Sequence, residues 1–238
     1  MTTHAFGGRS RPHVWTRLHL SIHWAWLAGG LALAFAVPFV LADLLEIQRD
    51  VYYGLYAGAV LALFALWSRS TGYDLVAAIA RRWPWAVGLG ALVAGVMALL
   101  VIRTEDATPH PDGLALAGAV LWRGVVYGAT DGLLLSAFPI LVVFAALAGS
   151  RLDRGLAGKL VIGAVALAAS LAMTGVYHAG YSDFRSEKVA KPLTGDLVWS
   201  VPTLVTLNPI GAPIAHAGMH VSAVLHSYET DTYLPPHR

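Results

Sequence analysis

Two histidines near the C-terminus, His216 and His220, are spaced by one turn of an α-helix. Residues four apart lie on one helix face, about 6 Å apart along the axis, so both imidazoles can point at the same object. That object can be a metal ion, a water molecule or a developing oxyanion. His178 ends the preceding apolar stretch and could complete a cluster of three histidines. The alternative is that these histidines only form hydrogen bonds between helices.

Arg123 and Asp131 are charged residues within one apolar block. Ionisable groups at membrane depth are costly, so each is a candidate functional residue. Asp131 is the candidate general base, and Arg123 is a candidate for holding an anionic group or a carbonyl. A turn is expected at 128–132, where small and polar residues interrupt the block and a turn would direct Asp131 toward the histidines. The alternative is an intramembrane ion pair, or pairing with backbone carbonyls at a helix end.

His19 and His23 repeat the four-residue spacing at the start of the first apolar stretch. The sequence around them, an arginine followed by histidines and a tryptophan, resembles the first helix of membrane b-type cytochromes, in which a histidine ligates haem. A haem b-binding electron-transfer subunit is therefore an alternative function. The other explanation is that histidines at the membrane edge extend toward the lipid headgroups.

Three segments in chain order resemble motifs of the CAAX protease and bacteriocin-processing (CPBP) family of intramembrane proteases. That family has a Glu-Glu-x-x-x-Arg-Gly helix, then a Phe-x-x-x-His helix, then a His-x-x-x-Asn motif. The matching segments are 122–128 with Arg123, 174–178 with His178, and 214–220 with His216. Thr174 replaces the phenylalanine and His220 replaces the asparagine. The resemblance implies an intramembrane, hydrolase-like protein with its site on these helices.

The paired glutamates of that family fall at Gly118 and Ala119, where this chain has no acid. In the family a glutamate activates the attacking water, so its loss puts proteolysis in question. Either the chain binds or scaffolds without cleaving, or Asp131 has taken over the role of the base. A non-catalytic membrane interaction protein is therefore a further alternative.

The combination of Asp131 with His178, His216 and His220 is also similar to the seven-helix zinc hydrolases of the alkaline ceramidase and adiponectin receptor group. Three neutral imidazoles and a water molecule make a catalytic zinc site. Zinc lowers the pKa of its bound water toward 7. Zinc is therefore the expected metal, and haem b is the alternative cofactor.

Helices in a lipid bilayer must position these residues. Of 238 residues, 57% are hydrophobic and 13% are charged, against about 25% charged in an ordinary soluble domain. This is too few charges to cover a soluble protein, so lipid must solvate much of the surface. The basic residues are scattered and the net charge is +2, which gives no footprint for nucleic acid. Cysteine is absent, which excludes thiolate metal sites and covalent haem attachment.

Apolar stretches close to the ~20 residues that cross a bilayer recur along the chain. The first is too long for the apolar region of a signal peptide and is interpreted as a retained span. The fourth is too long for one ordinary span, so it is either a two-helix hairpin or a single crossing. The last is broken at 208–213, where two prolines cannot continue a helix. The stretches are 18–42, 51–67, 85–102, 114–149, 157–179 and 196–227.

Basic residues in the short loops set the orientation. The N-terminal arm and the loop around Arg81 are basic, whereas the loops around Glu46 and Asp106 are acidic. The N-terminus is therefore predicted to be cytoplasmic. Beyond the fourth stretch, the basic clusters around Arg151 and Arg185 exchange sides depending on whether that stretch crosses once or as a hairpin.

The sequence thus predicts an all-α, polytopic membrane bundle of six to eight helices with a broken last segment, as one domain over 1–238. It is expected in a bacterial plasma membrane. Its surroundings are the lipid bilayer, with a membrane protein partner, a lipid or a peptide as possible ligands.

Overall fold

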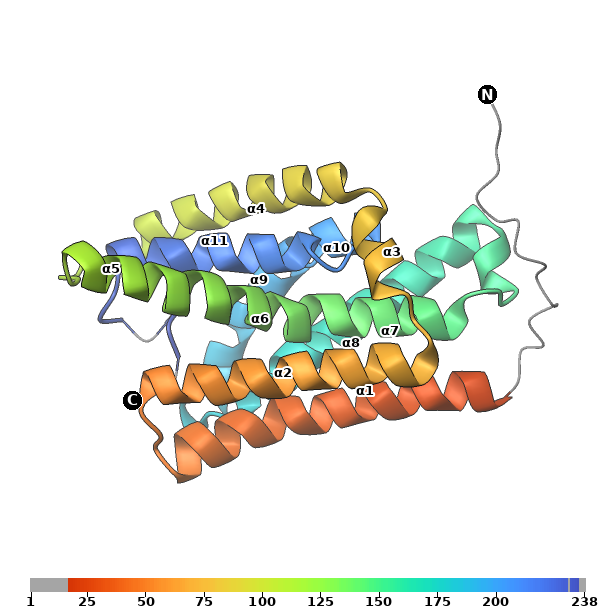
Figure 1. The fold of residues 1–238 in the computed structure, drawn as a ribbon, viewed down its shortest axis with the longest axis horizontal. Coiled ribbons are helices and arrows are strands. Elements are labelled where there is room, and N and C mark those ends of the chain that lie inside the picture. The colour runs from red at the N-terminus through yellow and green to blue at the C-terminus, as the bar shows by residue number, and fades with distance from the viewer. Residues whose placement is uncertain (1–16, 231, 236–238) are drawn as a thin grey trace.

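The regular structure of this chain is entirely helical in the part described by the computed structural model, residues 17–230 and 232–235. The long helices run side by side along the longest axis of the molecule (Figure 1). Five of the described helical segments are long and apolar enough to cross a membrane. The predicted all-α membrane bundle is therefore confirmed, whereas the predicted count of six to eight membrane helices stays a prediction.

The five long segments account for most of the bundle. Helix α1 continues into a π-helical stretch at Pro38–Leu44, and the fourth segment is the longest. They are α1 (Arg17–Val37), α2 (Arg49–Thr71), α4 (Trp83–Thr104), the segment Gly113–Leu147, and α8 (Leu156–Ala179). Short helices complete the bundle: α3 (Leu75–Ala80), α9 (Ala190–Trp199), α10 (Val201–Thr206) and α11 (Gly211–His226).

The segment Gly113–Leu147 is a single helix, so it crosses the bundle once and is not a hairpin (Figure 1). At 1.5 Å per residue its 35 residues extend about 52 Å. Two π-helical stretches interrupt its α-helical geometry, one on either side of the short α-helical part that carries Asp131. Its parts are α5 (Gly113–Ala119), π-helix Val120–Tyr127, α6 (Gly128–Gly132), π-helix Leu133–Ala137 and α7 (Phe138–Leu147).

The prediction that the chain turns at Gly128 to Gly132 is therefore wrong. The small residues there serve the packing of this helix against another one. Gly124, Gly128 and Gly132 lie four residues apart, on one face of this helix, and all three press against α11. A Cβ on Gly124 would lie 2.7 Å from the Val221 side chain, and one on Gly132 would lie 2.8 Å from the Ala212 carbonyl oxygen. Small residues at this spacing let two membrane helices approach closely. These glycines bring helices together rather than bend the chain.

The predicted break in the last apolar stretch is confirmed. Helix α10 ends at Thr206, Leu207 adopts a left-handed conformation with φ 53°, and α11 begins at Gly211. Protein groups satisfy the backbone freed by the break, as a membrane interior requires. The Thr203 hydroxyl donates to the Asn208 carbonyl at 3.0 Å and accepts from the Ala212 amide at 2.9 Å. The Asn208 side chain donates to two carbonyls at the end of α3.

One end of the bundle is closed by contacts between loops. Arg185 Nη2 donates to Asp43 Oδ2 at 3.0 Å, and Lys191 Nζ donates to Glu105 Oε1 at 2.8 Å. The C-terminal tail joins them, because the Glu229 amide donates to the Thr108 hydroxyl at 3.0 Å. We call this the tail end of the bundle; it comprises 45–48, 105–112, 180–189, 227–230 and 232–235.

Candidate metal centre

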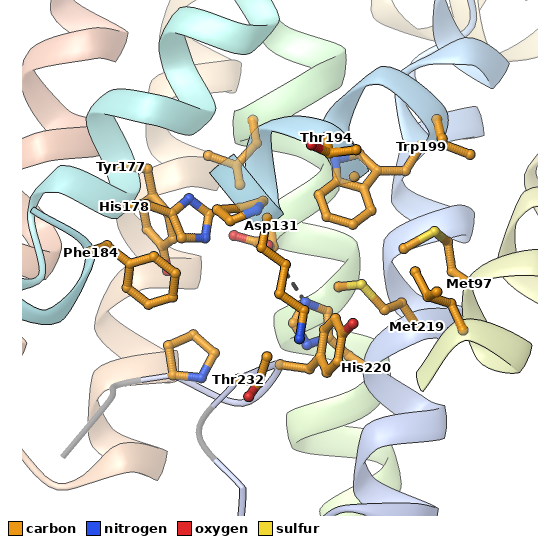
Figure 2. Close-up of a pocket in the computed structure, with 18 of the residues that line it drawn as sticks. Met97, Asp131, Tyr177, His178, Phe184, Thr194, Trp199, Met219, His220 and Thr232 are labelled. Atoms are coloured by element: carbon orange, nitrogen blue, oxygen red, sulfur yellow. Dashed lines mark ion pairs between the residues drawn. The ribbon is translucent and has the colours of Figure 1, made fainter. Parts of the chain in front are cut away.

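Asp131, His216 and His220 come together inside the bundle. Asp131 Oδ2 lies 3.4 Å from His216 Nδ1 and 3.5 Å from His220 Nε2. One donor atom from each of the three residues lies within 4.8 Å of the other two, and all three residues are buried. Figure 2 shows Asp131 and His220 facing each other across the dashed line that joins them.

The glycine contacts explain why these groups meet. Gly128 and Gly132 flank Asp131, and a Cβ on either would lie 2.9 Å from an imidazole carbon, that of His220 or His216. The two histidines lie one turn apart on α11, as their spacing predicted. The close approach of the two helices therefore places the carboxylate of one against the imidazoles of the other.

Several polar atoms of this group lack hydrogen-bond partners. These are Nδ1 of His216 and both ring nitrogens of His220. Asp131 is held from its other side, because the Tyr56 hydroxyl donates to Oδ1 at 2.9 Å. Buried polar atoms nearly always form hydrogen bonds. His216 Nδ1 and His220 Nε2 lie beside the Asp131 carboxylate without a hydrogen bond to it, which makes them candidate ligands of a bound ion. Two bonds of about 2.1 Å at a tetrahedral angle separate their donor atoms by roughly 3.4 Å, which agrees with the two distances from Asp131 Oδ2 to the histidines.

A cavity of about 430 Å³ reaches this group from the tail end of the bundle. Asp131 and His220 lie in its wall, and His178 lines the same cavity (Figure 2). Most of the remaining lining is apolar or aromatic, which is typical of sites for small molecules. It includes Met97, Leu100, Leu135, Phe184, Trp199 and Met219.

His178 shares the cavity but does not belong to the close group. The three residues whose donor atoms gather within 4.8 Å are Asp131, His216 and His220. The Nδ1 of His178 donates to the Thr174 carbonyl at 2.8 Å, since a carbonyl can only accept. Its ring packs edge-on against Tyr177. The third member of the close group is thus Asp131, whereas the sequence analysis expected His178 in that role.

Arg123, expected near the site, is not among the residues that line the cavity. It forms a bidentate pair with Asp50, with both nitrogen–oxygen distances at 2.8 Å. Its guanidinium also lies over the Tyr228 ring, 4.9 Å from the centroid. The reason is the continuous helix, which places Arg123 eight residues, or about 12 Å, from Asp131.

His23 is engaged elsewhere in the bundle. Trp67 Nε1 donates to His23 Nδ1 at 3.2 Å, so Nδ1 of this buried imidazole carries no hydrogen. A neutral ring then carries its hydrogen on Nε2, which is the nitrogen that a haem iron usually needs. The side chain of His19 lies outside the described residues.

Two buried polar clusters were missed by the sequence analysis. Asp196 lies in α9, with its two oxygens surrounded by donors from four side chains: Ser136, Ser170, Trp199 and Ser200. The second cluster contains four tyrosine hydroxyls joined by four hydrogen bonds, from Tyr52, Tyr127, Tyr177 and Tyr181. Serines inside apolar stretches, and tyrosines recurring at helical spacing, were the sequence signals for both.

Comparison of the chain with models of protein families, with curated proteins and with solved structures found no match. Fold and site together therefore define a polytopic helical membrane protein with a buried aspartate–histidine group at an apolar cavity. Such a group can hold a metal ion through three protein ligands, which leaves further positions open to water or substrate.

Proposed function

We propose that this protein is a membrane-embedded, metal-dependent hydrolase, with zinc held by Asp131, His216 and His220. The observation that carries the proposal is that one carboxylate and two imidazoles gather deep in the bundle, beside a cavity that reaches them. Zinc held by three protein ligands activates a water molecule at neutral pH. His178, in the same cavity wall, is placed to bind the substrate or move a proton.

The cavity suggests the class of substrate. Its mostly apolar lining favours a molecule with a long apolar part, and its position inside a membrane bundle favours a molecule drawn from the bilayer. We therefore propose hydrolysis of an ester or amide bond in a lipid or in a membrane peptide. The resemblance to CPBP proteases supports the peptide, and the similarity to the zinc hydrolase group supports the lipid.

We also propose that the cavity opens on the side of the membrane opposite the cytoplasm. A single crossing by Gly113–Leu147 puts Arg151, Arg154 and Lys159 on the same side as Arg81 and the start of α1. Basic residues accumulate on the cytoplasmic side. The tail end of the bundle is then outside, and it carries the acidic loops around Glu46 and Asp106 together with the basic cluster around Arg185.

Metal analysis of the purified protein in detergent tests the metal site. We expect about one zinc per chain after zinc loading and dialysis, and loss of that zinc in His216→Gln and His220→Gln. His226→Gln is the matched control, since His226 lies on the same helix but its Nε2 donates to the Glu105 carbonyl. Equal zinc content in all three variants would refute the site.

Hydrolysis is tested separately with 4-methylumbelliferyl palmitate and an N-palmitoyl aminocoumarin in mixed micelles. Turnover that disappears in His220→Gln, and persists in His226→Gln, supports the proposal. Zinc binding without turnover of either probe, or of a set of membrane peptides, would favour the non-catalytic alternative. An absorbance spectrum with a haem Soret band would favour electron transfer instead.

A further inference from the structure

A chain of hydrogen bonds connects the metal centre to the second buried acid. His216 Nε2 lies 3.4 Å from Ser136 Oγ, and Ser136 Oγ lies 2.9 Å from Asp196 Oδ1. His216 therefore lies between two buried carboxylates, with Asp131 on its Nδ1 side and Asp196 beyond Ser136 on its Nε2 side. All of these residues are buried, so water does not compete for the bonds.

The direction of each bond follows from counting hydrogens. A serine hydroxyl has one hydrogen, and Ser136 donates it to the carboxylate of Asp196. Ser136 can then only accept from His216, so Nε2 of His216 must carry a hydrogen. A neutral imidazole with a hydrogen on Nε2 presents a lone pair at Nδ1. That lone pair faces Asp131 Oδ2, which is also an acceptor, at 3.4 Å.

Two acceptors facing each other need a cation or a hydrogen between them. Asp196 is fixed in the orientation that this requires, because Trp199 Nε1 and the Ser200 hydroxyl donate to Oδ1 at 2.9 and 2.8 Å. The Ser170 hydroxyl lies 2.8 Å from Oδ2. An indole nitrogen can only donate, so Oδ1 must accept. The Trp199 ring also packs against His216, with centroids 4.6 Å apart.

We infer that Asp196, acting through Ser136, is a positioning residue that holds His216 as the Nε2–H tautomer and aims Nδ1 at the metal. This inference deepens the proposed function and rests on it. Groups that hydrogen-bond to metal-binding histidines in this way fix the ring and its tautomer, and their loss weakens metal binding by about 10- to 100-fold.

Ser136→Ala and Ser170→Ala form a matched pair of variants. Both remove a buried hydroxyl that lies within hydrogen-bond distance of Asp196, but of the two only Ser136 contacts His216. We expect Ser136→Ala to weaken zinc affinity by about 10-fold or more, and Ser170→Ala to change it far less. Equal losses in the two variants would mean that Asp196 acts through general stability, which would overturn the inference.

Nitrogen-15 NMR of the zinc-free protein, labelled at histidine, supplies a readout that does not depend on metal. The His216 signal, assigned by its loss in His216→Gln, should show hydrogen on Nε2 in the natural protein and a mixture of tautomers in Ser136→Ala. Hydrogen on Nδ1 in the natural protein would overturn the inference. Failure of the natural protein to bind zinc would instead refute the proposed function, since the tautomer is still measured.

Asp196→Asn is a second variant that tests the inference if the Ser136→Ala protein does not fold. It keeps the size of the side chain and the oxygen that accepts from both Trp199 and Ser136, but removes the charge that strengthens the bond from Ser136. We expect it to weaken zinc binding less than Ser136→Ala does, and to mix the His216 tautomers in part. Unchanged affinity and an unchanged tautomer in this variant would overturn the inference.

Discussion

Gly128 lies so close to the backbone of Ala217 that a Cβ at position 128 would come within 2.8 Å of the Ala217 Cα. The contact joins the helix that carries Asp131 to the helix that carries His216 and His220. The geometry of the candidate metal centre therefore depends on the absence of a side chain at this position.

Gly128→Ala should separate the two helices. Inserting a methyl group into a close contact typically costs 1–3 kcal/mol, as an order of magnitude, and the shift should also reduce zinc binding. Unfolding in detergent and metal analysis measure the two effects. Gly118→Ala is the control on the same helix, since a Cβ there meets nothing within 4 Å. A Gly128→Ala protein with normal stability and normal zinc content would contradict the packing argument.

Tyr56→Phe should destabilise the protein and weaken zinc binding, because it removes the hydrogen bond to Asp131 Oδ1. A hydrogen bond to a charged group contributes about 1.5–3 kcal/mol. Tyr53→Phe is the comparison on the same helix, because its buried hydroxyl has no hydrogen-bond partner. We expect Tyr53→Phe to be neutral or slightly stabilising. Similar losses from the two substitutions would show that Tyr56 does not hold the carboxylate.

Arg123→Gln should reduce stability modestly and leave zinc binding unchanged, because Arg123 pairs with Asp50 and not with the site. Asp50 is 38% exposed, so solvent screens the pair and its contribution should be about 1 kcal/mol or less. A double-mutant cycle with Asp50→Asn isolates that coupling in unfolding experiments. Loss of zinc in a folded Arg123→Gln protein would contradict this prediction and would show that Arg123 takes part in zinc binding.

Lys188→Cys should react with a membrane-impermeant maleimide on intact cells, and Arg154→Cys should react only after the cells are opened. Lys188 lies at the tail end of the bundle, which we propose to be outside, and Arg154 lies at the opposite end. The chain has no cysteine of its own, so each variant carries a single reactive thiol. The reverse pattern of labelling would invert the proposed orientation.

The sequence predicted the helices well because apolar length is a local property. The break after Thr206 was equally visible, since proline and glycine act on their own neighbourhood. The interior of the longest helix was not predicted correctly. Gly128 and Gly132 were interpreted as a turn. The local sequence does not distinguish a glycine that bends the chain from one that packs against another helix.

The site was predicted in part for the same reason. His216 and His220 were found because their spacing on one helix suffices, and Asp131 because a carboxylate in an apolar stretch stands out. The Asp131–His216 contact depends on which helix packs against which, and spacing alone does not contain that information. Asp196 was not predicted because two of its four partners, Ser136 and Ser170, lie far from it in the sequence, and only the folded chain brings them together.

The glycine contacts also limit which ions the centre can hold. Three contacts between the helices, at Gly124, Gly128 and Gly132, fix the distance from the carboxylate to the imidazoles through the backbone. The ligand atoms of Asp131, His216 and His220 cannot move apart unless these helix contacts open. Calcium, which takes six to eight oxygen ligands at about 2.3–2.6 Å, therefore fits poorly. Ions that accept nitrogen ligands at about 2.0–2.2 Å fit well, so ionic radius and nitrogen affinity together should determine which metal the protein acquires.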